Sequence, residues 1–191
     1  MKKISIFLLV PFFGFVNVLS GQENTGSYST ILKNETPNFA TFSTDGKYIA
    51  AGVYGAIRIW ETGTEKFKDY KTNLKNETPL FVCFSPNDKY MAAGVYGAVR
   101  VWELHTNSFT DYEVKLKNET PNGVCFSPNG EHMAAGIYGA VRVWDLKSGA
   151  FTDYPTRLRN ETPKHVSFSA DSQFIAAGVY GEVRTWNISE M

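Results

Sequence analysis

The sequence predicts an all-β fold, a β-propeller of four blades with 42 residues in each. A segment Lys-Asn-Glu-Thr-Pro begins at Lys33 and recurs at Lys75 (75 − 33 = 42), at Lys117 and, with Arg in place of Lys, at Arg159. Aromatic residues make up 15% of the chain, and 16 Gly and 8 Pro supply many turns, which favours short strands over helices. A unit repeated at this period buries its apolar face by stacking on its neighbours.

The third copy shows the expected course of one blade. Residues 124–126 form a short apolar strand that ends at a Ser-Pro-Asn-Gly turn, and residues 132–136 form a second strand. Residues 140–144 alternate as a third strand should, and residues 151–154 make a fourth. Pro155 follows directly and is tolerated only at the edge of a sheet, so the fourth strand is expected to be the outermost.

The chain before the first copy resembles the end of a fourth strand. Residues 28–32 align with residues 70–74 and 154–158, whereas the last copy stops after its third strand. The N-terminal strand is therefore expected to complete the last blade, which covers a sheet edge that would otherwise invite aggregation. Two closures satisfy this pattern. One chain closes as a four-blade ring, or two chains exchange N-terminal strands and form an eight-blade homodimer.

The first 20 residues have the pattern of a signal peptide. Two lysines precede an apolar run over residues 4–18, and small residues follow at Ser20 and Gly21. Cleavage is expected after Ser20 or, as second choice, after Gly21. The run is shorter than the roughly 20 apolar residues of a membrane span and contains Pro11, so we expect a secreted or periplasmic protein without a membrane span.

Removal of the signal peptide leaves a nearly neutral chain. It takes away two of 19 basic residues and none of the 19 acidic ones, which gives a net charge of 17 − 19 = −2. Without a basic surface, nucleic acid is not an expected partner. The expected organisation is a signal peptide over residues 1–20, a linker over 21–26 and a propeller over 27–189.

The core of each copy resembles the WD repeat. In the third copy the residues that carry the resemblance are Phe-Ser-Pro-Asn-Gly at 126–130, Ala-Ala-Gly at 134–136, Val-Arg-Val-Trp-Asp-Leu at 141–146 and Ser-Gly at 148–149. The resemblance covers residues 33–188 and implies a propeller. The copies depart from the family pattern, because only the third has Trp-Asp, the usual Gly-His is missing, and Tyr138 stands near the position of the family's turn Asp. The hydrogen-bond network of His, Asp, Ser and Trp found in the family is therefore not expected.

One face of the ring is the predicted binding surface. The loop that enters the first strand and the turn between the second and third strands should lie on the same side, which gathers Asn, Glu and Tyr there. The candidate ligand-binding residues are Tyr54, Tyr96, Tyr138, Tyr180, Asn34, Asn76, Asn118, Asn160, Glu35, Glu77, Glu119 and Glu161. Such a surface suits a protein, a peptide or a glycan. Alternatively, each Tyr packs within its blade, and the Glu residues pair with Arg58, Arg100, Arg142 and Arg184.

No catalytic or metal-binding pattern is apparent. His105, His132 and His165 occupy different positions of the repeat, which predicts no metal site. No nucleophile–base set or phosphate-binding loop is present, so we expect neither an enzyme nor a cofactor. Cys83 and Cys125 share a repeat position, and the sequence leaves their pairing open. The expected function is a secreted binding module or scaffold; a purely structural, self-assembling propeller is the alternative, and a hydrolase is less expected.

Overall fold

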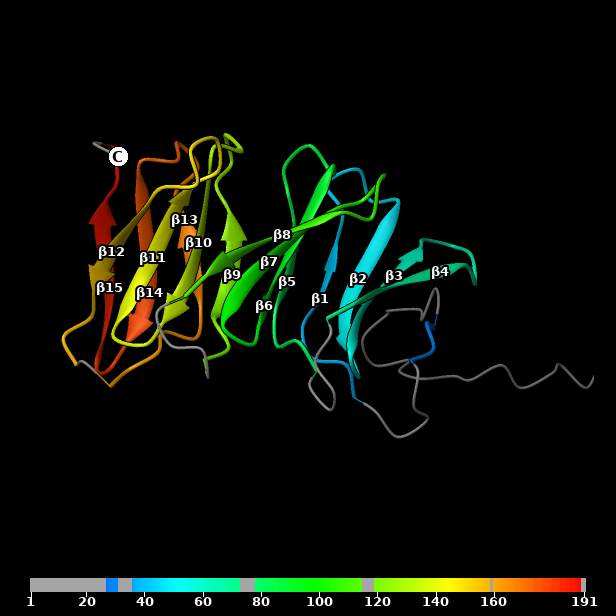
Figure 1. Cartoon of the computed structure of the whole chain (residues 1–191), viewed down its shortest axis with the longest axis horizontal. Helices are drawn as coiled ribbons and strands as arrows, with labels where there is room; N and C mark the ends of the chain where they lie inside the picture. Colours follow the sequence, from blue (N-terminus) through cyan, green and yellow to red (C-terminus); the bar gives the residue numbers. More distant parts are fainter. Residues whose placement is uncertain (1–26, 31–35, 73–77, 115–118, 159, 190–191) are drawn as a thin grey trace, which may run out of the picture.

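The structure is a computed structural model that describes residues 27–30, 36–72, 78–114, 119–158 and 160–189. These residues contain fifteen β-strands and no helix (Figure 1). Consequently, no helix long and apolar enough to cross a membrane occurs in the described part. The predicted signal peptide and linker lie outside the described residues.

The strands fall into four antiparallel sheets, one for each copy of the repeat. The first sheet contains β1 (Ala40–Phe42), β2 (Tyr48–Val53), β3 (Ala56–Glu61) and β4 (Phe67–Lys71). The second contains β5 (Val82–Phe84), β6 (Tyr90–Val95), β7 (Ala98–Glu103) and β8 (Phe109–Glu113). The third contains β9 (Asn122–Phe126), β10 (His132–Ile137), β11 (Ala140–Asp145) and β12 (Phe151–Pro155). The fourth contains only β13 (Val166–Phe168), β14 (Phe174–Val179) and β15 (Glu182–Asn187).

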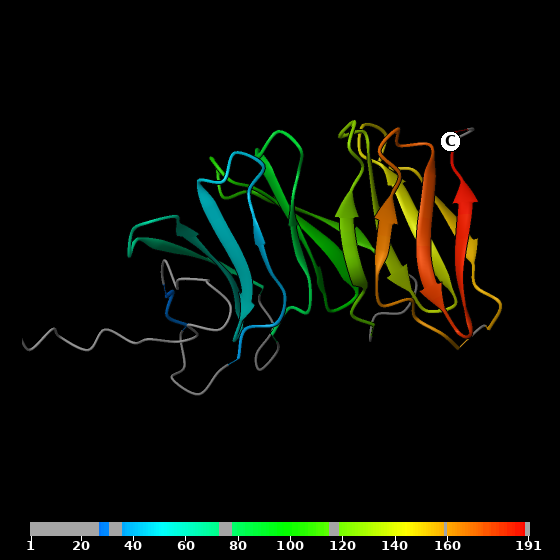
Figure 2. The same ribbon diagram turned by 180° about the vertical axis from the view of Figure 1, so that it is seen from behind.

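The predicted propeller architecture is confirmed. The strands of the third copy lie within two residues of their expected limits, and β12, which contains Pro155, is the outermost strand of its sheet, as expected. The short first strands contact one another between neighbouring blades, β1 with β5, β5 with β9 and β9 with β13. The blades follow one another along the long axis of the molecule, so the first and last blades lie at its two opposite ends (Figures 1 and 2).

Local side-chain chemistry sets the hairpin between the first two strands of each blade. In the third blade the Ser127 hydroxyl donates to Asn129 Oδ1 over 2.6 Å and accepts the backbone N–H of His132 at 2.9 Å. Gly130 adopts a φ of 74°, which a side chain would strain. Ser43, Ser85 and Ser169 make the same pair of bonds in the other blades. The turn thus satisfies several of its own polar groups, and the next blade adds a further bond, in which the Asn129 backbone N–H donates to Ser172 Oγ.

The core lies between blades rather than within them. Each sheet places one apolar face against the next sheet; for example, Val99 and Val101 of the second blade pack against Met133 and Trp144 of the third. Apolar burial of this kind contributes roughly 25 cal/mol per Å² of surface removed from water. A blade therefore depends on its neighbour for stability.

A glycine in the second strand allows neighbouring blades to approach closely. A Cβ atom placed on Gly136 would lie 2.0 Å from the carbonyl oxygen of Pro163, at the entrance to the fourth blade. Gly52 and Gly94 meet Pro79 and Pro121 in the same way. The glycine of the Ala-Ala-Gly segment is thus required by a backbone contact between blades in the first three copies.

The position of the N-terminal segment differs from the expectation. Within the described residues β15 pairs only with β14, so the segment does not complete the last blade of its own chain. Instead the Tyr28 ring packs 6.0 Å from that of Trp60 in the first blade. The first and last blades lie too far apart along the arc for one short segment to serve both.

We predict that Gly136→Ala destabilises the protein by about 1–3 kcal/mol, because its Cβ overlaps the Pro163 carbonyl and forces the third and fourth blades apart. The free energy of unfolding in urea measures this loss. The control Thr152→Ala, at an exposed position of β12, should cost less than about 0.5 kcal/mol. Equal stability of the two variants would contradict the close approach.

Candidate functional site

The turn between the second and third strands lies against the loop that enters the next blade. The backbone N–H of Gly97 donates to the Glu119 carbonyl over 2.6 Å, and Gly139 makes the same bond to Glu161. Each bond joins a Tyr-Gly turn of one blade to the Asn-Glu-Thr-Pro loop of the following blade. The two segments therefore share one side of the arc, where the sequence places the candidate binding face.

The four tyrosines of this face are exposed. Their exposed fractions are 42% for Tyr54, 47% for Tyr96, 51% for Tyr138 and 79% for Tyr180. Packing inside a blade does not account for side chains with this exposure. The turns hold the tyrosines in a row at one repeat position, since adjacent turns are linked through the intervening loops.

The glutamates of the face differ from the tyrosines in their surroundings. The Glu119 carboxylate accepts the backbone N–H of Tyr138, and partial burial raises the pKa of this carboxyl above its usual value. The bond to Tyr138 and the charge of Arg142 act in the opposite direction. Glu119 thus supports the turn that presents Tyr138. Asn160 is exposed at the equivalent loop, whereas Asn34, Asn76, Asn118, Glu35 and Glu77 lie outside the described residues.

The repeated arginines have carboxylate partners other than the loop glutamates. Arg142 binds Asp153 of β12 through two bonds, Nε to Oδ1 at 2.5 Å and Nη2 to Oδ2 at 2.8 Å. Its guanidinium lies 3.8 Å from the centre of the Phe151 ring. The pairs Arg58–Asp69 and Arg100–Asp111 repeat this arrangement, and Arg184 pairs with Glu182. Neither Glu119 nor Glu161, the two described glutamates of these loops, forms an ion pair with these arginines, and Glu35 and Glu77 lie outside the described residues. In the sequence, an Asp eleven residues after each of the first three arginines could have indicated the pairing with Asp.

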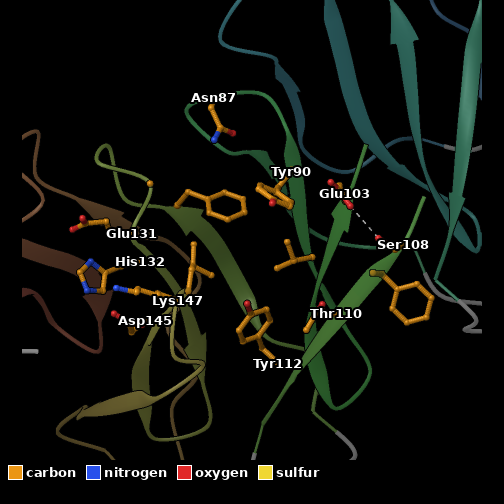
Figure 3. A pocket seen from close by; sticks show the side chains of 15 residues that line it. Asn87, Tyr90, Glu103, Ser108, Thr110, Tyr112, Glu131, His132, Asp145 and Lys147 are labelled. Carbon is orange, nitrogen blue, oxygen red and sulfur yellow. Dashed lines mark hydrogen bonds between the residues drawn. The ribbon is translucent and has the colours of Figure 1, made fainter. Parts of the chain in front are cut away.

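A groove at the opposite end of the blades was not anticipated from the sequence. It encloses about 720 Å³ between the second and third blades (Figure 3). Its walls combine aromatic rings, among them Tyr90, Phe109 and Tyr112, with the polar side chains of Glu103, Glu131, His132, Asp145 and Lys147. A smaller groove of about 300 Å³ lies between the first two blades, with Tyr48, Phe67 and Tyr70 at the same repeat positions. Recurrence of these aromatic positions at 42-residue spacing was the signal that could have indicated it.

The described residues contain no group of three His, Cys, Asp or Glu side chains able to hold a metal ion. His165 instead packs edge-on against Phe81, with ring centres 5.0 Å apart. Both cysteines are free and partly exposed to solvent as residues. Burial of the thiols raises the pKa of Cys125 to about 12 and that of Cys83 further, which keeps both protonated and poorly reactive at neutral pH.

The buried, paired arginine in each of the first three blades should be a major contributor to stability. The Arg142 side chain is 3% exposed, so Asp153→Asn leaves a buried cation without a counter-charge. We expect a loss of roughly 2–4 kcal/mol in the free energy of unfolding. Removal of the exposed pair between Lys66 and Glu61 by Lys66→Met should cost less than about 0.5 kcal/mol. Similar losses for both variants in urea unfolding would show that the buried pair has no special role.

Glu119 should make stability depend on pH. Its folded-state pKa is raised by burial, so its contribution is fully present below the unfolded pKa of about 4.3 and is lost as pH rises through the folded value. Glu119→Gln removes this loss, and its free energy of unfolding should exceed that of the wild type increasingly between pH 4 and pH 7. Urea titrations across this range, with exposed Glu65→Gln as control, test the effect. Parallel pH profiles for wild type and Glu119→Gln would refute it.

Comparison with known proteins agrees with the architecture. The family model "WD domain, G-beta repeat" matches residues 74–103 and 114–145, which span most of the second and third blades. A search among curated proteins found no match to the chain. The indole N–H of Trp60 is buried without a hydrogen-bond partner among the described residues, in keeping with the absence of the family's usual polar network from this copy. The second and third of the four copies are therefore similar to the WD repeat.

Proposed function

We propose that the protein is an exported interaction module that recognises a peptide segment of a partner protein through its row of exposed tyrosines. WD-repeat propellers act in general as protein-interaction modules or scaffolds. The observation that carries the proposal is the repetition of exposed Tyr96, Tyr138 and Tyr180 on one face, each in a turn fixed at the same repeat position.

The physical properties of this face suit peptide recognition. A tyrosine offers an apolar ring and a hydroxyl at a low cost in side-chain entropy. The turn that carries Tyr138 is tied to the next blade through Gly139 and to the preceding loop through Glu119, so the ring is presented from a constrained backbone. Preorganisation of this kind reduces the ordering cost of binding. Asn160 and the equivalent loop residues would supply polar contacts at the rim.

Export forms part of the same proposal. Cleavage of residues 1–20, after Ser20 or Gly21, would place the propeller outside the cytoplasm as a secreted or periplasmic protein. The proposed role is recognition without catalysis and without a cofactor. Mass spectrometry of the N-terminal peptide of the exported protein tests the cleavage site.

The groove between the second and third blades supports a second candidate surface. The groove lies on the side of the arc opposite to the tyrosine row. Its volume of about 720 Å³ and its aromatic walls would accommodate a peptide. Three carboxylates and one lysine line it, and this excess of negative charge would favour a basic segment. A third possibility is self-assembly alone, in which two chains form a homodimer through their N-terminal strands and bind nothing else.

A peptide selected from a random phage-displayed library against the mature chain provides the probe. We expect Tyr96→Ala and Tyr138→Ala each to raise the Kd of this peptide about tenfold or more while the melting temperature stays nearly unchanged, because exposed interface tyrosines often dominate binding. Isothermal titration calorimetry measures the affinities.

The matched variant Tyr90→Ala separates the two surfaces, since Tyr90 lines the groove and not the tyrosine row. Weakening by Tyr90→Ala alone would transfer the site to the groove. Selection of no peptide, together with saturable binding on a glycan array, would change the class of partner. Failure of both screens would favour the self-assembly alternative.

A further inference from the structure

The fourth blade ends the arc with a face that has no neighbour. Ile57, Val99 and Val141 occupy one position of the repeat, and each is fully buried against the following blade. Val183 occupies the same position in the fourth blade and is 76% exposed. The last blade therefore presents an apolar side chain that every other blade uses for stacking.

The same face contains an empty socket. Gly178 retains the glycine that the other blades need for the approach of a proline carbonyl, yet no atom lies within 4 Å of a Cβ placed on it. A cavity of about 340 Å³ occupies this place, lined by Gly178, Tyr180, Glu161 and His165 among others. Within the described residues, the buried Oε2 atom of Glu161 has no hydrogen-bond partner. The socket thus has the shape and the unsatisfied polar group of an incomplete junction.

The first blade carries the matching half of such a junction. Pro37 stands at the position of Pro121 and Pro163, which insert at Gly94 and Gly136, but it is more exposed than they are. Ala40 is exposed, whereas its equivalents Val82, Val124 and Val166 are buried. The two ends of the arc are therefore the two halves of the contact that the chain already makes three times.

The N-terminal segment is held on the first blade as the last strand of a preceding blade would be. Fourth-strand tyrosines contact the tryptophan of the following blade, with ring centres 6.3 Å apart for Tyr112–Trp144 and 6.4 Å for Tyr154–Trp186. Tyr28 contacts Trp60 at 6.0 Å. In addition, Arg58 Nη1 donates to the Ser29 carbonyl at 3.2 Å, as Arg142 Nη1 does to that of Glu113.

A pair of coupled substitutions links this segment to the fourth blade. In the other blades the third-strand arginine binds a fourth-strand Asp, and the residue two positions before that arginine is Ala56, Ala98 or Ala140. The N-terminal segment has Ser27 at the position of this Asp, so it offers no carboxylate. The fourth blade has Glu182 in place of the alanine, and Glu182 pairs with Arg184. Glu182 of the fourth blade thus provides Arg184 with the negative charge that an Asp of the fourth strand provides in the other blades, and that Ser27 cannot provide.

We infer that two copies of the chain join head to tail at both ends and form a closed ring of eight blades. Residues 27–30 of one copy pair with β15 of the other, and Pro37 of the first copy fills the socket at Gly178 of the second. A second copy is required because the two ends of one arc lie at opposite ends of the molecule (Figures 1 and 2). Each interface joins two different surfaces, the first blade of one copy and the fourth blade of the other. Two such interfaces close the ring.

This inference develops the homodimer named above as the third possibility, and it does not depend on recognition by the tyrosine row. A monomer that binds the selected peptide would overturn the ring and leave recognition intact, and a dimer that binds no peptide would do the reverse. The two failures are therefore distinguishable.

A disulfide trap tests which chain supplies the missing strand. The pairing of Ala56 with Lys71 and of Ala140 with Pro155 places Glu182 opposite Ser29 of the other copy. In a mature chain that carries Cys83→Ser and Cys125→Ser, the added substitutions Ser29→Cys and Glu182→Cys should give a covalent dimer on non-reducing gels. The control combines Ser29→Cys with Asn187→Cys at the far end of β15, and it should remain uncrosslinked. A disulfide formed within one chain, or no disulfide, would overturn the inference.

The mass in solution gives an independent test. Light scattering coupled to size exclusion should show twice the mass of the mature chain. Gly178→Val and Val183→Asp should each raise the dimer dissociation constant at least tenfold. The circular dichroism of the monomer should stay unchanged, because in the single chain no atom lies close to a Cβ at position 178 and Val183 is exposed. Thr152→Ala should leave the dimer intact. A wild-type monomer at micromolar concentration, or dimers unaffected by both socket variants, would refute the ring.

Discussion

The structure depends on the burial of each sheet against the next one. A blade has two apolar faces that pack on neighbouring blades; Trp144 and Met133, for example, are buried in one cluster with Val99 and Val101 of the preceding blade. The contact is close enough to exclude a side chain at Gly136, where the backbone of the next blade takes its place. Stability is therefore a sum over junctions between blades more than a sum over blades, as in other repeat proteins.

The polar interactions follow from this arrangement. In each of the first three blades the fourth strand has a neighbouring strand on one side only, and a buried arginine of the third strand binds its Asp. Arg100 reaches Asp111 with Nε, stacks on Phe109, and donates to the Thr72 carbonyl of the preceding blade. The Arg100 side chain thus connects β7 and β8 of its own blade with the residue that follows β4 in the preceding blade. The loops on the tyrosine face add main-chain bonds between the same neighbours.

Much of the fold could be predicted from the sequence because its determinants are local and repeated. The Asn129-Gly130 turn, the alternation in residues 140–144 and the edge position of Pro155 each depend on a few adjacent residues, and the 42-residue repeat carries this assignment over to the other copies. The common side of the tyrosine turns and the entering loops also followed from strand order. The partner of each arginine did not, because Glu119 and Asp153 are both near Arg142 and only the register of β11 with β12 selects Asp153. The groove beside Tyr90 was missed for a related reason: its walls come from two blades, and their separation is not encoded in either one.

The uniform junction has a consequence for how such a chain changes over time. Every boundary between copies is made by the same residue types at the same spacing, and Gly52, Gly94 and Gly136 each face a proline at one position of the next copy. Duplication or loss of a whole 42-residue copy therefore leaves each surviving boundary chemically unaltered. The number of blades can thus change by whole repeats without a new contact between blades. An insertion of a few residues at a boundary would instead disrupt the contact between the two blades that it separates.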